Sequence, residues 1–465
     1  MQKLFDEVGS LDTRCFDEFG LSEAILMEHA AQGMAEFIRK KFPKNAKVLV
    51  VCGSGNNGAD GIALARLLYK DYDVRWFMLN APKSPMAILQ HTIAHKIGMR
   101  ITLDLNECDV LVDALFGTGF NGELDYEAKA VMQTINKRNA YKISCDIPSG
   151  LKRNGQCDEY IFKADTTLTM GALKKAMFSD AAKDYVGKIK VLDLGISRTI
   201  YETSSNWNIL DLQDLELPTR SKKNTHKGTY GHLVLLCGEK SGASIVSGLS
   251  ALNFGSGLVT LVSNTSKPLM VPYSLMCSQK IPSNTTALAL GMGLGDAFSQ
   301  QELDVFLENK LPMLVDADLC HMPMIVDILK REKVVITPHP KEFISILKLT
   351  KIADITLEEL QNNRFKYSEA FSKIYPNVTL ILKGANVIIA SNETYFINPH
   401  GTPALSKGGS GDVLSGLVGA LLAQGYTPVH AAIHASLAHT QLAQNYKDSD
   451  FSLTPEDLVK GISKL

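Results

Sequence analysis

The sequence predicts an α/β protein built as two domains, each with a mostly parallel sheet covered by helices on both faces. Short apolar runs alternate with helix-length amphipathic segments, a pattern typical of βαβ units. Several of the apolar runs end in glycine-rich loops. Between residues 195 and 223 the alternation stops, and Ser, Thr, Asn and scattered charges take its place. We therefore predict domains over 1–205 and 220–465, with the boundary at roughly 200–222.

Composition argues against several classes of partner. The 465 residues carry a net charge of −1, which gives no electrostatic reason to bind nucleic acid or an anionic membrane. The eight cysteines form no Cys-x-x-Cys pair, and the segment from Met1 to Glu7 lacks the apolar core of a leader peptide. No uncharged stretch reaches the length of a membrane span. We expect a cytoplasmic protein that acts on small molecules.

The first domain opens with a helix and then a strand, a loop and a second helix. Apolar residues recur at helical spacing over 22–41, and Ser22 suits the N-cap position. The run 47–52 is apolar and is predicted as a strand, followed by the glycine loop 53–61 and an amphipathic helix over 62–70. Further strands are predicted at 74–79, 109–115, 141–147, 166–170 and 188–192, separated by helix-length segments such as 86–97 and 126–138.

The first glycine loop matches the dinucleotide-binding fingerprint but departs from its usual use. The pattern Gly53-x-Gly55-x-x-Gly58 stands between a strand and a helix, as the fingerprint requires. However, Asp60 lies in the first helical turn, where it would repel a pyrophosphate, and the strand ending at Leu79 is followed by no acidic residue for a ribose. We interpret the loop as a polar pocket that offers the side chains of Asn56, Asn57 and Asp60.

Two more loops follow predicted strands of the same sheet. Asp113 begins the segment 113–122, and Asp146 and Ser149 lie in the segment 146–150. The carboxyl ends of parallel strands share one edge of a sheet, so we expect these loops to meet there. Oxygen ligands such as those of Asn57, Asp113 and Ser149 suit a hard cation, and so few charges suit a monovalent ion at least as well as magnesium.

The second domain repeats the alternation. Its predicted strands are 233–237, 258–262, 287–290, 313–315, 334–336, 379–382 and 387–390, with a small-residue helix over 243–254 and two helices after residue 412. Turns that follow these strands include Gly291 to Gly295, a segment around His339 between two prolines, and Lys383 to Asn386. Because the prolines fix the backbone and loops carry sites disproportionately, we interpret His339 as functional.

A glycine loop near the C-terminus indicates phosphate chemistry. Three of the four residues from Gly408 to Gly411 are glycines, and an apolar helix follows whose first turn carries Asp412. Backbone N–H groups of such a loop can converge on an anion. A carboxylate placed beside that anion suits a base that takes a proton from a hydroxyl attacking phosphorus. The structural alternative is an ordinary loop with Asp412 as a helix-start residue.

Three histidines on the last long helix do not read as a metal site. His430, His434 and His439 lie in a segment rich in Ala and Leu, without an H-E-x-x-H pattern or a cysteine partner. We interpret them as helix-face residues.

Taken together, these stretches resemble the bifunctional NAD(P)H-hydrate repair family, in which an epimerase domain is fused to an ADP- or ATP-dependent dehydratase domain. The motifs that carry the resemblance are, in order, 53–61, 113–122, 146–150, His226-Lys227-Gly228, 337–343, 383–386 and 408–412. The resemblance implies a Rossmann-like three-layer domain followed by a ribokinase-like three-layer α/β domain. It also implies epimerisation of R- and S-NAD(P)HX at C6, and dehydration of the S epimer to NAD(P)H with release of AMP or ADP and phosphate.

For the first domain, the resemblance implies that the hydrated cofactor is bound by Asn56, Asn57, Gly58, Ala59, Asp60, Gly117, Thr118, Gly119, Phe120, Asn121, Gly122, Glu123 and Asp146. It places potassium at Asn57, Asp113 and Ser149, and it leaves either Asp113 or Asp146 as the group that assists proton transfer.

For the second domain, the resemblance implies that ADP or ATP, together with Mg²⁺, is bound by Lys383, Gly384, Ala385, Asn386, Val387 and Gly411. The hydrate would lie near Ala243, Gly293, Gly295, His339 and Asp412, with Asp412 as the catalytic base. Departures from the family pattern are Ala59 and Lys341, which replace glycines, and Ser410, which replaces threonine. Small-residue helices such as 243–257 suit packing between copies, so we expect a homo-oligomer.

Two alternatives remain open at this point. A small-molecule kinase of the ribokinase type would share the glycine loop and would leave a stable phosphorylated alcohol. A non-catalytic nucleotide or cofactor sensor would bind without turnover, and the presence of Asp412 argues against it.

Overall fold

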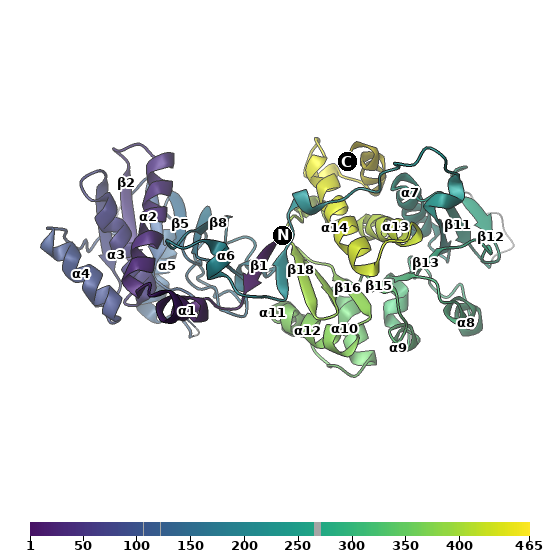
Figure 1. Cartoon of the computed structure of the whole chain (residues 1–465), viewed down its shortest axis with the longest axis horizontal. Helices are drawn as coiled ribbons and strands as arrows, with labels where there is room; N and C mark the ends of the chain where they lie inside the picture. The colour runs from purple at the N-terminus through teal and green to yellow at the C-terminus, as the bar shows by residue number, and fades with distance from the viewer. Residues whose placement is uncertain (106, 121, 265–270) are drawn as a thin grey trace. The chain divides into compact units, whose positions relative to one another are not determined.

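Figure 1 shows the computed structural model of the chain, which describes residues 1–105, 107–120, 122–264 and 271–465. The chain forms two compact units, one over Lys3–Trp207 and the other over Asn208–Leu465 together with Met1–Gln2. We call them the N-terminal and the C-terminal unit.

A parallel sheet organises the N-terminal unit, with strands in the order β3-β2-β4-β5-β6-β8. These strands are β2 (Lys47–Cys52), β3 (Asp73–Met78), β4 (Val110–Ala114), β5 (Tyr141–Cys145), β6 (Thr166–Met170) and β8 (Lys188–Leu192). The helices are α1 (Gly9–Phe19), α2 (Glu23–Lys41), α3 (Asn56–Leu68), α4 (Pro85–Lys96), α5 (Tyr126–Asn136) and α6 (Arg198–Tyr201). Two short strands, β1 (Gln2–Phe5) and β7 (Leu173–Lys174), pair in parallel.

Alternation along β2 explains the three layers of this unit. Val48 and Val50 pack in one apolar cluster with side chains of α2 and α3, whereas Leu49 and Val51 pack in a second cluster with α5. Helices therefore cover both faces of the sheet, as predicted. The predicted helix over 22–41 is also confirmed, with the Ser22 side chain as its N-cap. However, α3 begins at Asn56, so the residues predicted as the end of a loop form helical turns.

The strands of the C-terminal unit follow the order β12-β11-β10-β13-β14-β15-β16-β17-β18. Pairing is parallel from β12 to β16 and antiparallel from β16 to β18. The strands are β10 (His232–Leu236), β11 (Leu258–Val262), β12 (Met276–Ser278), β13 (Ala287–Leu290), β14 (Met313–Val315), β15 (Val334–Ile336), β16 (Val378–Leu382), β17 (Val387–Ser391) and β18 (Thr394–Asn398), and β9 (Trp207–Ile209) precedes them.

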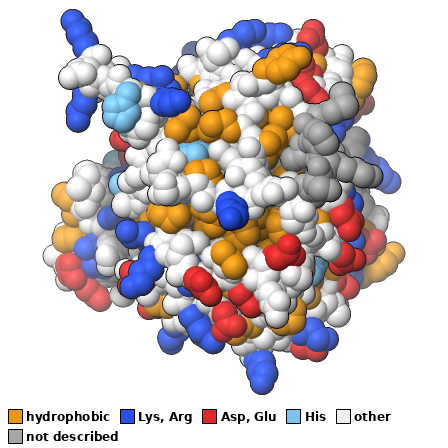
Figure 2. All heavy atoms as spheres, turned by 90° about the vertical axis from the view of Figure 1, so that its right-hand side faces the viewer, with side chains coloured by type: hydrophobic (Ala, Val, Ile, Leu, Met, Phe, Trp, Pro, Cys, Tyr) orange, Lys and Arg blue, Asp and Glu red, His pale blue; other side chains and the backbone are white. Residues whose placement is uncertain are grey.

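Helices of the C-terminal unit are α7 (Ser241–Asn253), α8 (Gln300–Glu308), α9 (Ile325–Ile328), α10 (Pro340–Leu349), α11 (Leu357–Asn362), α12 (Arg364–Ile374), α13 (Ser410–Ala423), α14 (Pro428–Asn445) and α15 (Pro455–Gly461). Figure 2 shows the face of this unit at the β12 end, where apolar side chains gather near the centre and charges of both signs surround them. The predicted α/β class is confirmed in both units.

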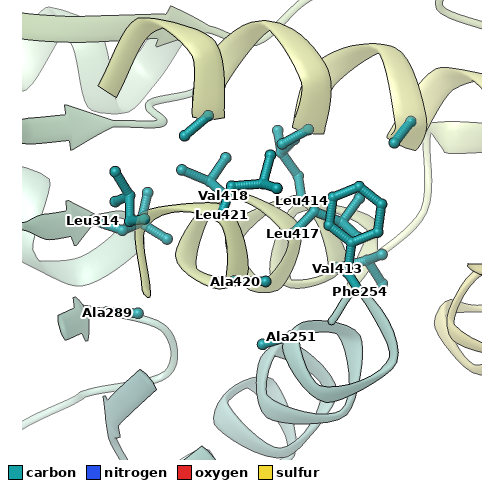
Figure 3. Packing of buried hydrophobic residues seen from close by; sticks show 14 of the residues in the cluster. Ala251, Phe254, Ala289, Leu314, Val413, Leu414, Leu417, Val418, Ala420 and Leu421 are labelled. Atoms are coloured by element: carbon teal, nitrogen blue, oxygen red, sulfur yellow. The ribbon is translucent and has the colours of Figure 1, made fainter. Parts of the chain in front are cut away.

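Helix α13 is the centre of the C-terminal core. Every residue from Val413 to Ala423 is buried, as expected of a helix that is apolar on all sides. Figure 3 shows Val413, Leu417 and Leu421 packed among side chains from α7 and from the sheet. A Cβ at Gly416 would lie 2.2 Å from the Ser247 carbonyl oxygen, so only glycine permits this approach of α13 to α7. The start of α13 is therefore held in a fixed position.

Within the described ranges, none of the helices has the length and apolar character that a bilayer crossing requires.

Candidate active sites

A cavity of about 640 Å³ lies within the N-terminal unit, at the edge where its central strands end. The strands β2 and β4 are neighbours, so the loops that follow them meet at this edge. The predicted residues that line the cavity are Asn56, Asn57, Asp60, Gly117, Thr118, Gly119, Phe120 and Asp146. The structure thus brings together most of the side chains that the three separate loops were predicted to contribute.

Close backbone contacts explain the glycine spacing of the first loop. A Cβ at Gly53 would lie 2.0 Å from the Leu115 carbonyl oxygen, and one at Gly58 would lie 1.9 Å from the Gly53 carbonyl oxygen. Gly58 and Ala59 are buried in the first turns of α3 behind the cavity wall. Gly122 and Glu123 are exposed, and Asn121 lies outside the described residues.

Asp146 is held in the cavity wall by a buried ion pair. It follows β5 with a left-handed backbone, φ 68°, which is uncommon outside glycine. Its Oδ1 accepts hydrogen bonds from the Met170 backbone N–H at 3.1 Å and from Lys174 Nζ. The ammonium group of Lys174 also donates to Thr169 Oγ1 at 2.9 Å, and the side chain is only 1% exposed. No pattern in the sequence singled out Lys174; the pairing depends on β7 reaching this edge.

Further acidic side chains line the same cavity, and the sequence did not single out two of them. Asp12 comes from α1 and Glu23 from the first turn of α2, and both join Asp60 and Asp146 around the cavity. Burial, together with the negative charge of Asp146, raises the pKa of Asp60 well above its usual range. This shift favours the protonated form of Asp60, which can donate a hydrogen bond into the cavity.

The predicted cation ligands lie together beneath the loop at 115–120. Asp113 and Ser149 are fully buried, and Asp113 accepts hydrogen bonds from the Ser149 hydroxyl at 2.6 Å and the Ser149 N–H at 2.8 Å. Burial raises the pKa of Asp113 to about 6. The Asn57 amide packs against Gly117, and its nitrogen is buried without a hydrogen-bond partner in the described part of the chain.

That orphaned amide is the observation that fits a cation here. Its oxygen and nitrogen ends are interchangeable in assignment, so the buried end can present an oxygen. No group of three or more His, Cys, Asp or Glu side chains is placed to hold a metal among the described residues. A cation at this place would therefore depend on amide, hydroxyl and carbonyl oxygens with the carboxylate of Asp113, a donor set suited to potassium.

In the C-terminal unit, the anion loop Gly408–Gly411 leads into α13. Gly409 has a left-handed backbone, φ 88°, and Asp412 lies in the first turn of the helix. The first N–H groups of a helix have no partner within it and attract anions. A Cβ at Gly411 would lie 3.4 Å from Lys383 Nζ, so the lysine ammonium stands beside this loop. The site combines two sources of positive charge with the carboxylate of Asp412.

Lys383 is positioned by two acidic residues that the sequence did not connect to it. Its Nζ lies 2.9 Å from Asp316 Oδ1 and 3.8 Å from Glu342 Oε2. The second oxygen of Asp316 accepts a hydrogen bond from Ser415 Oγ at 2.6 Å. Burial alone would lower the pKa of Lys383, but Asp316 and Glu342 raise it, so the ammonium stays charged.

These charges also act on Asp412. Burial, with the negative charges of Asp316 and Glu342, raises the pKa of Asp412 to about 6, while Lys383 opposes the shift. The Asp412 backbone carbonyl accepts a hydrogen bond from Ser247 Oγ at 2.8 Å, which ties it to α7. A carboxylate with this pKa is suited to general-base catalysis near neutral pH.

The other predicted residues surround this centre. Gly384 and Ala385 are exposed in the turn between β16 and β17, and buried Arg364 clamps that turn by donating to the carbonyls of Leu382, Lys383 and Asn386 at 3.0–3.2 Å. Val387 begins β17 behind the turn. A Cβ at Gly293 would lie 3.1 Å from Ala243 Cβ, and the Gly295 N–H donates to Asp318 at 2.9 Å.

The structure gives each of two histidines a contact that the sequence interpretation did not include. His339 is the N-cap of α10, with Glu342 in a reciprocal capping box, so the H-x-x-E spacing was a signal for Glu342. His439 was interpreted as a helix-face residue, and its Nε2 lies 3.1 Å from Ser410 Oγ at the anion loop. Burial lowers the pKa of His439 to about 4, so it is neutral at neutral pH.

Comparisons with known proteins match both halves of the chain. Residues 23–176 match the family described as YjeF-related protein N-terminus, and residues 233–464 match the family described as NAD(P)H-hydrate dehydratase. A bifunctional NAD(P)H-hydrate repair enzyme of Helicobacter pylori is 42% identical, with 100% of both chains covered. One from Coxiella burnetii is 30% identical over 92% of this chain and 91% of its own.

Solved structures align with the C-terminal half. One is an ADP/ATP-dependent NAD(P)H-hydrate dehydratase from Bacillus subtilis, co-crystallised with ATP and Mg²⁺. It is 29% identical, covers 53% of this chain and 92% of its own, and has a TM-score of 0.46. The resemblance inferred from the ordered motifs is confirmed by the full-length relatives: the chain belongs to the bifunctional NAD(P)H-hydrate repair enzymes.

Proposed function

We propose that this chain repairs hydrated NADH and NADPH with two activities, an epimerase in domain 1–205 and an ADP- or ATP-dependent dehydratase in domain 220–465. The observation that carries the proposal is that each unit has its own set of acid–base groups, the cavity around Asp146 and the anion loop beside Asp412. The full-length match to bifunctional repair enzymes supports the pairing of the two activities.

In the dehydratase, Asp412 accepts the proton of the C6 hydroxyl while that oxygen attacks the terminal phosphorus of the nucleotide. The bond to the leaving nucleotide breaks, and AMP or ADP departs. The C6–O bond of the phosphate ester then breaks, a proton leaves C5, and the C5–C6 double bond reforms with release of phosphate. Lys383 and the N–H groups of the anion loop bind the transferred phosphate and stabilise its charge.

Magnesium would neutralise charge on the nucleotide phosphates. The carboxylates near the proposed phosphate position are those of Asp316, Glu342 and Asp412, and the first two already face Lys383. We therefore propose that Mg²⁺ arrives with the nucleotide instead of occupying a site of its own. The exposed turn at Lys383–Val387, clamped by Arg364, binds the nucleotide, and Ala243, Gly293, Gly295 and His339 border the hydrate.

In the epimerase, Asp146 is the proposed catalytic carboxylate because it lines the cavity and the ammonium group of Lys174 lies beside it. Asn56, Asp60 and the loop Gly117–Phe120 bind the hydrated nicotinamide cofactor. Asp113 accepts three hydrogen bonds beneath the loop, so we assign it to potassium binding with Asn57 and Ser149. A potassium ion there would supply positive charge that orders the loop at 115–120.

The test is to incubate the purified chain with R- and S-NADPHX and ADP or ATP. The proposal requires that dihydronicotinamide absorbance returns from both epimers and that inorganic phosphate is released. A stable phosphorylated product from an added alcohol would instead indicate a kinase of the ribokinase type. Nucleotide binding without any turnover would indicate a sensor.

Two further proposals concern the cellular compartment and the oligomeric state of the protein. All eight cysteines are free, which supports a reducing compartment such as the cytoplasm. Helix α4 exposes Ile88 and Leu89, and Ile97 follows it, with 40–50% of each side chain accessible; this apolar surface supports a homo-oligomer.

A further inference from the structure

Asp12 and Tyr201 form a hydrogen-bonded pair in the wall of the N-terminal cavity. The Tyr201 hydroxyl donates to Asp12 Oδ1 at 2.8 Å, and both residues line the cavity together with Asp60 and Asp146. The pair lies outside the ranges 23–176 and 233–464 that match family models. Neither residue was part of the predicted site, because they come from opposite ends of the N-terminal unit.

The pair is built rigidly. Arg14 on α1 donates to the backbone carbonyls of Ile200 and of Tyr201, the latter at 2.7 Å, so α1 and α6 are tied together beside it. Tyr201 is 1% exposed, and a Cβ at Gly171 would lie 2.5 Å from its ring. Only glycine at position 171 leaves room for the ring in this place. The Tyr201 hydroxyl is therefore held pointing at Asp12.

Epimerisation at C6 needs more than one acid–base group. When the C6–O bond breaks, the leaving oxygen must gain a proton, and the ring nitrogen's lone pair forms a C6–N1 double bond. Water must then add to the other face of C6 and lose a proton. A single carboxylate fixed on one side of the substrate cannot serve both faces, whereas this cavity contains carboxyl groups from separate elements.

We propose that Asp12, positioned by Tyr201, is the second acid–base catalyst of the epimerase and works together with Asp146. This inference rests on the proposed epimerase function. One carboxyl group protonates the departing hydroxyl to give water, and the other carboxylate takes the proton from the water that adds to C6. N1 recovers its lone pair as the new C6–O bond forms. At the end of the reaction the group that gave up its proton is ionised and the other group is protonated. This is the arrangement that the reverse reaction needs.

Charges around Asp12 suit this role. Burial raises its pKa above the usual range, and the hydrogen bond from Tyr201 opposes that shift. The titratable groups that face it are Tyr201 of α6, Glu23 of α2, Asp60 of α3, Cys15 of its own helix, and Asp146 and Lys174 at the strand ends. The reaction needs one proton shared between two carboxyl groups, so kcat/KM has a bell-shaped pH profile whose limbs belong to the pair.

The experiment compares Asp12→Asn and Tyr201→Phe with Asp17→Asn, an exposed residue on the same helix. We measure R-to-S interconversion against pH, and separately the ADP-dependent dehydration of purified S epimer. Asp12→Asn lowers interconversion by about 10²–10⁴-fold, while dehydration and the Asp17→Asn variant stay at wild-type rates. Tyr201→Phe removes a hydrogen bond that favours the carboxylate form, so the alkaline limb moves to higher pH. Wild-type epimerisation in isotopically labelled water introduces solvent oxygen at C6.

Full interconversion by Asp12→Asn overturns the proposal, as does epimerised product without solvent oxygen. If Asp12→Asn does not fold, judged by thermal unfolding, the Tyr201→Phe profile decides: a lower rate with an unmoved alkaline limb means that the pair is only structural. Failure of the wild-type chain to interconvert the epimers would refute the proposed function itself, an outcome distinct from loss in these variants.

Discussion

The proposed sites of both units contain carboxylates, at a sheet edge in the N-terminal unit and at a helix start in the C-terminal unit. The residues around these carboxylates differ. The N-terminal cavity is lined by Asp12, Glu23, Asp60 and Asp146, with Lys174 behind the last of them. At the C-terminal site Asp412 stands at the positive end of α13 beside Lys383, whose ammonium group also faces Asp316 and Glu342. The first arrangement suits reversible proton transfer, and the second suits a phosphoryl transfer that drives the reaction one way.

Burial of a carboxyl group serves different chemistry in the two units. Burial raises the pKa of Asp60 and of Asp412, yet their neighbours differ. Asp60 faces Asp146 and Asp12, and Lys174 only partly opposes the shift, so the protonated form of Asp60 is favoured. Asp412 faces Asp316 and Glu342 as well as Lys383, and its pKa of about 6 lets it act as a base at neutral pH.

The largest expected effect is a loss of dehydration that leaves epimerisation unchanged. Asp412→Ala should lower dehydration of S-NADPHX by up to ~10⁴-fold, because the attacking hydroxyl loses its base. In the wild type the dehydration rate should fall as the pH drops through about 6, where Asp412 becomes protonated. Absorbance of the dihydronicotinamide product measures both, and exposed Asp448→Ala is the control. Loss of epimerase activity in Asp412→Ala would contradict the separation of the sites.

Asp146→Asn tests whether epimerisation takes place in the N-terminal cavity. Asparagine tolerates the left-handed backbone at this position and keeps an oxygen that can accept from Lys174, so the fold should persist at lower stability while the carboxylate is lost. We expect R-to-S interconversion to fall by about 10²–10³-fold with dehydration of the S epimer intact. Chiral separation of the epimers over time measures the first rate. An unchanged rate would remove Asp146 from the mechanism.

Lys383→Met should affect both stability and catalysis of the C-terminal unit. It leaves Asp316 and Glu342 facing each other without a cation, which costs about 3–5 kcal/mol when a buried pair is broken. It also removes the charge that opposes the pKa shift of Asp412, so the acid limb of dehydration should move to higher pH. Thermal unfolding and a pH profile check the two effects. An acid limb at lower pH would contradict the assigned electrostatics.

Removing potassium should affect only the N-terminal unit. Replacing it with a bulky organic cation should lower the epimerase rate, because we propose that Asn57, Asp113 and Ser149 bind a monovalent metal ion. Dehydration of purified S epimer serves as the internal control. Equal sensitivity of both activities would show that the effect is not at this site.

His439→Gln should have the smallest effect. Losing the hydrogen bond to Ser410 costs about 1 kcal/mol, so the KM for nucleotide should rise several-fold as the anion loop loosens. Exposed His430→Gln, on the same helix, is the matched control. A change in the epimerase rate would contradict the assignment.

Much of the architecture could be predicted from apolar alternation, since β2 and β4 are buried on both faces and read as continuous apolar runs. Glycine spacing located the loops, because Gly53 and Gly58 leave no room for a side chain. The helix α1 and the short strand β7 were missed: β7 has only two residues, whereas α1 has an amphipathic pattern that could have predicted it.

Partners of the site residues were harder to predict than the residues themselves. Lys174 meets Asp146, and Asp316 meets Lys383, only because the sheet brings separate strand ends to one edge. Such pairings depend on topology and leave no local trace in the sequence. Glu342 is the exception, since its spacing from His339 is that of a capping box.

The most direct measurement follows recovery of dihydronicotinamide absorbance from an equal mixture of R- and S-NADPHX with ADP or ATP. With the wild type we expect complete recovery, and with Asp146→Asn we expect a rapid phase that stops once the S epimer is consumed. Asp412→Ala should give no recovery. A wild-type chain that restores no absorbance, or an Asp146→Asn variant that converts both epimers at the wild-type rate, would contradict the division of labour between the two units.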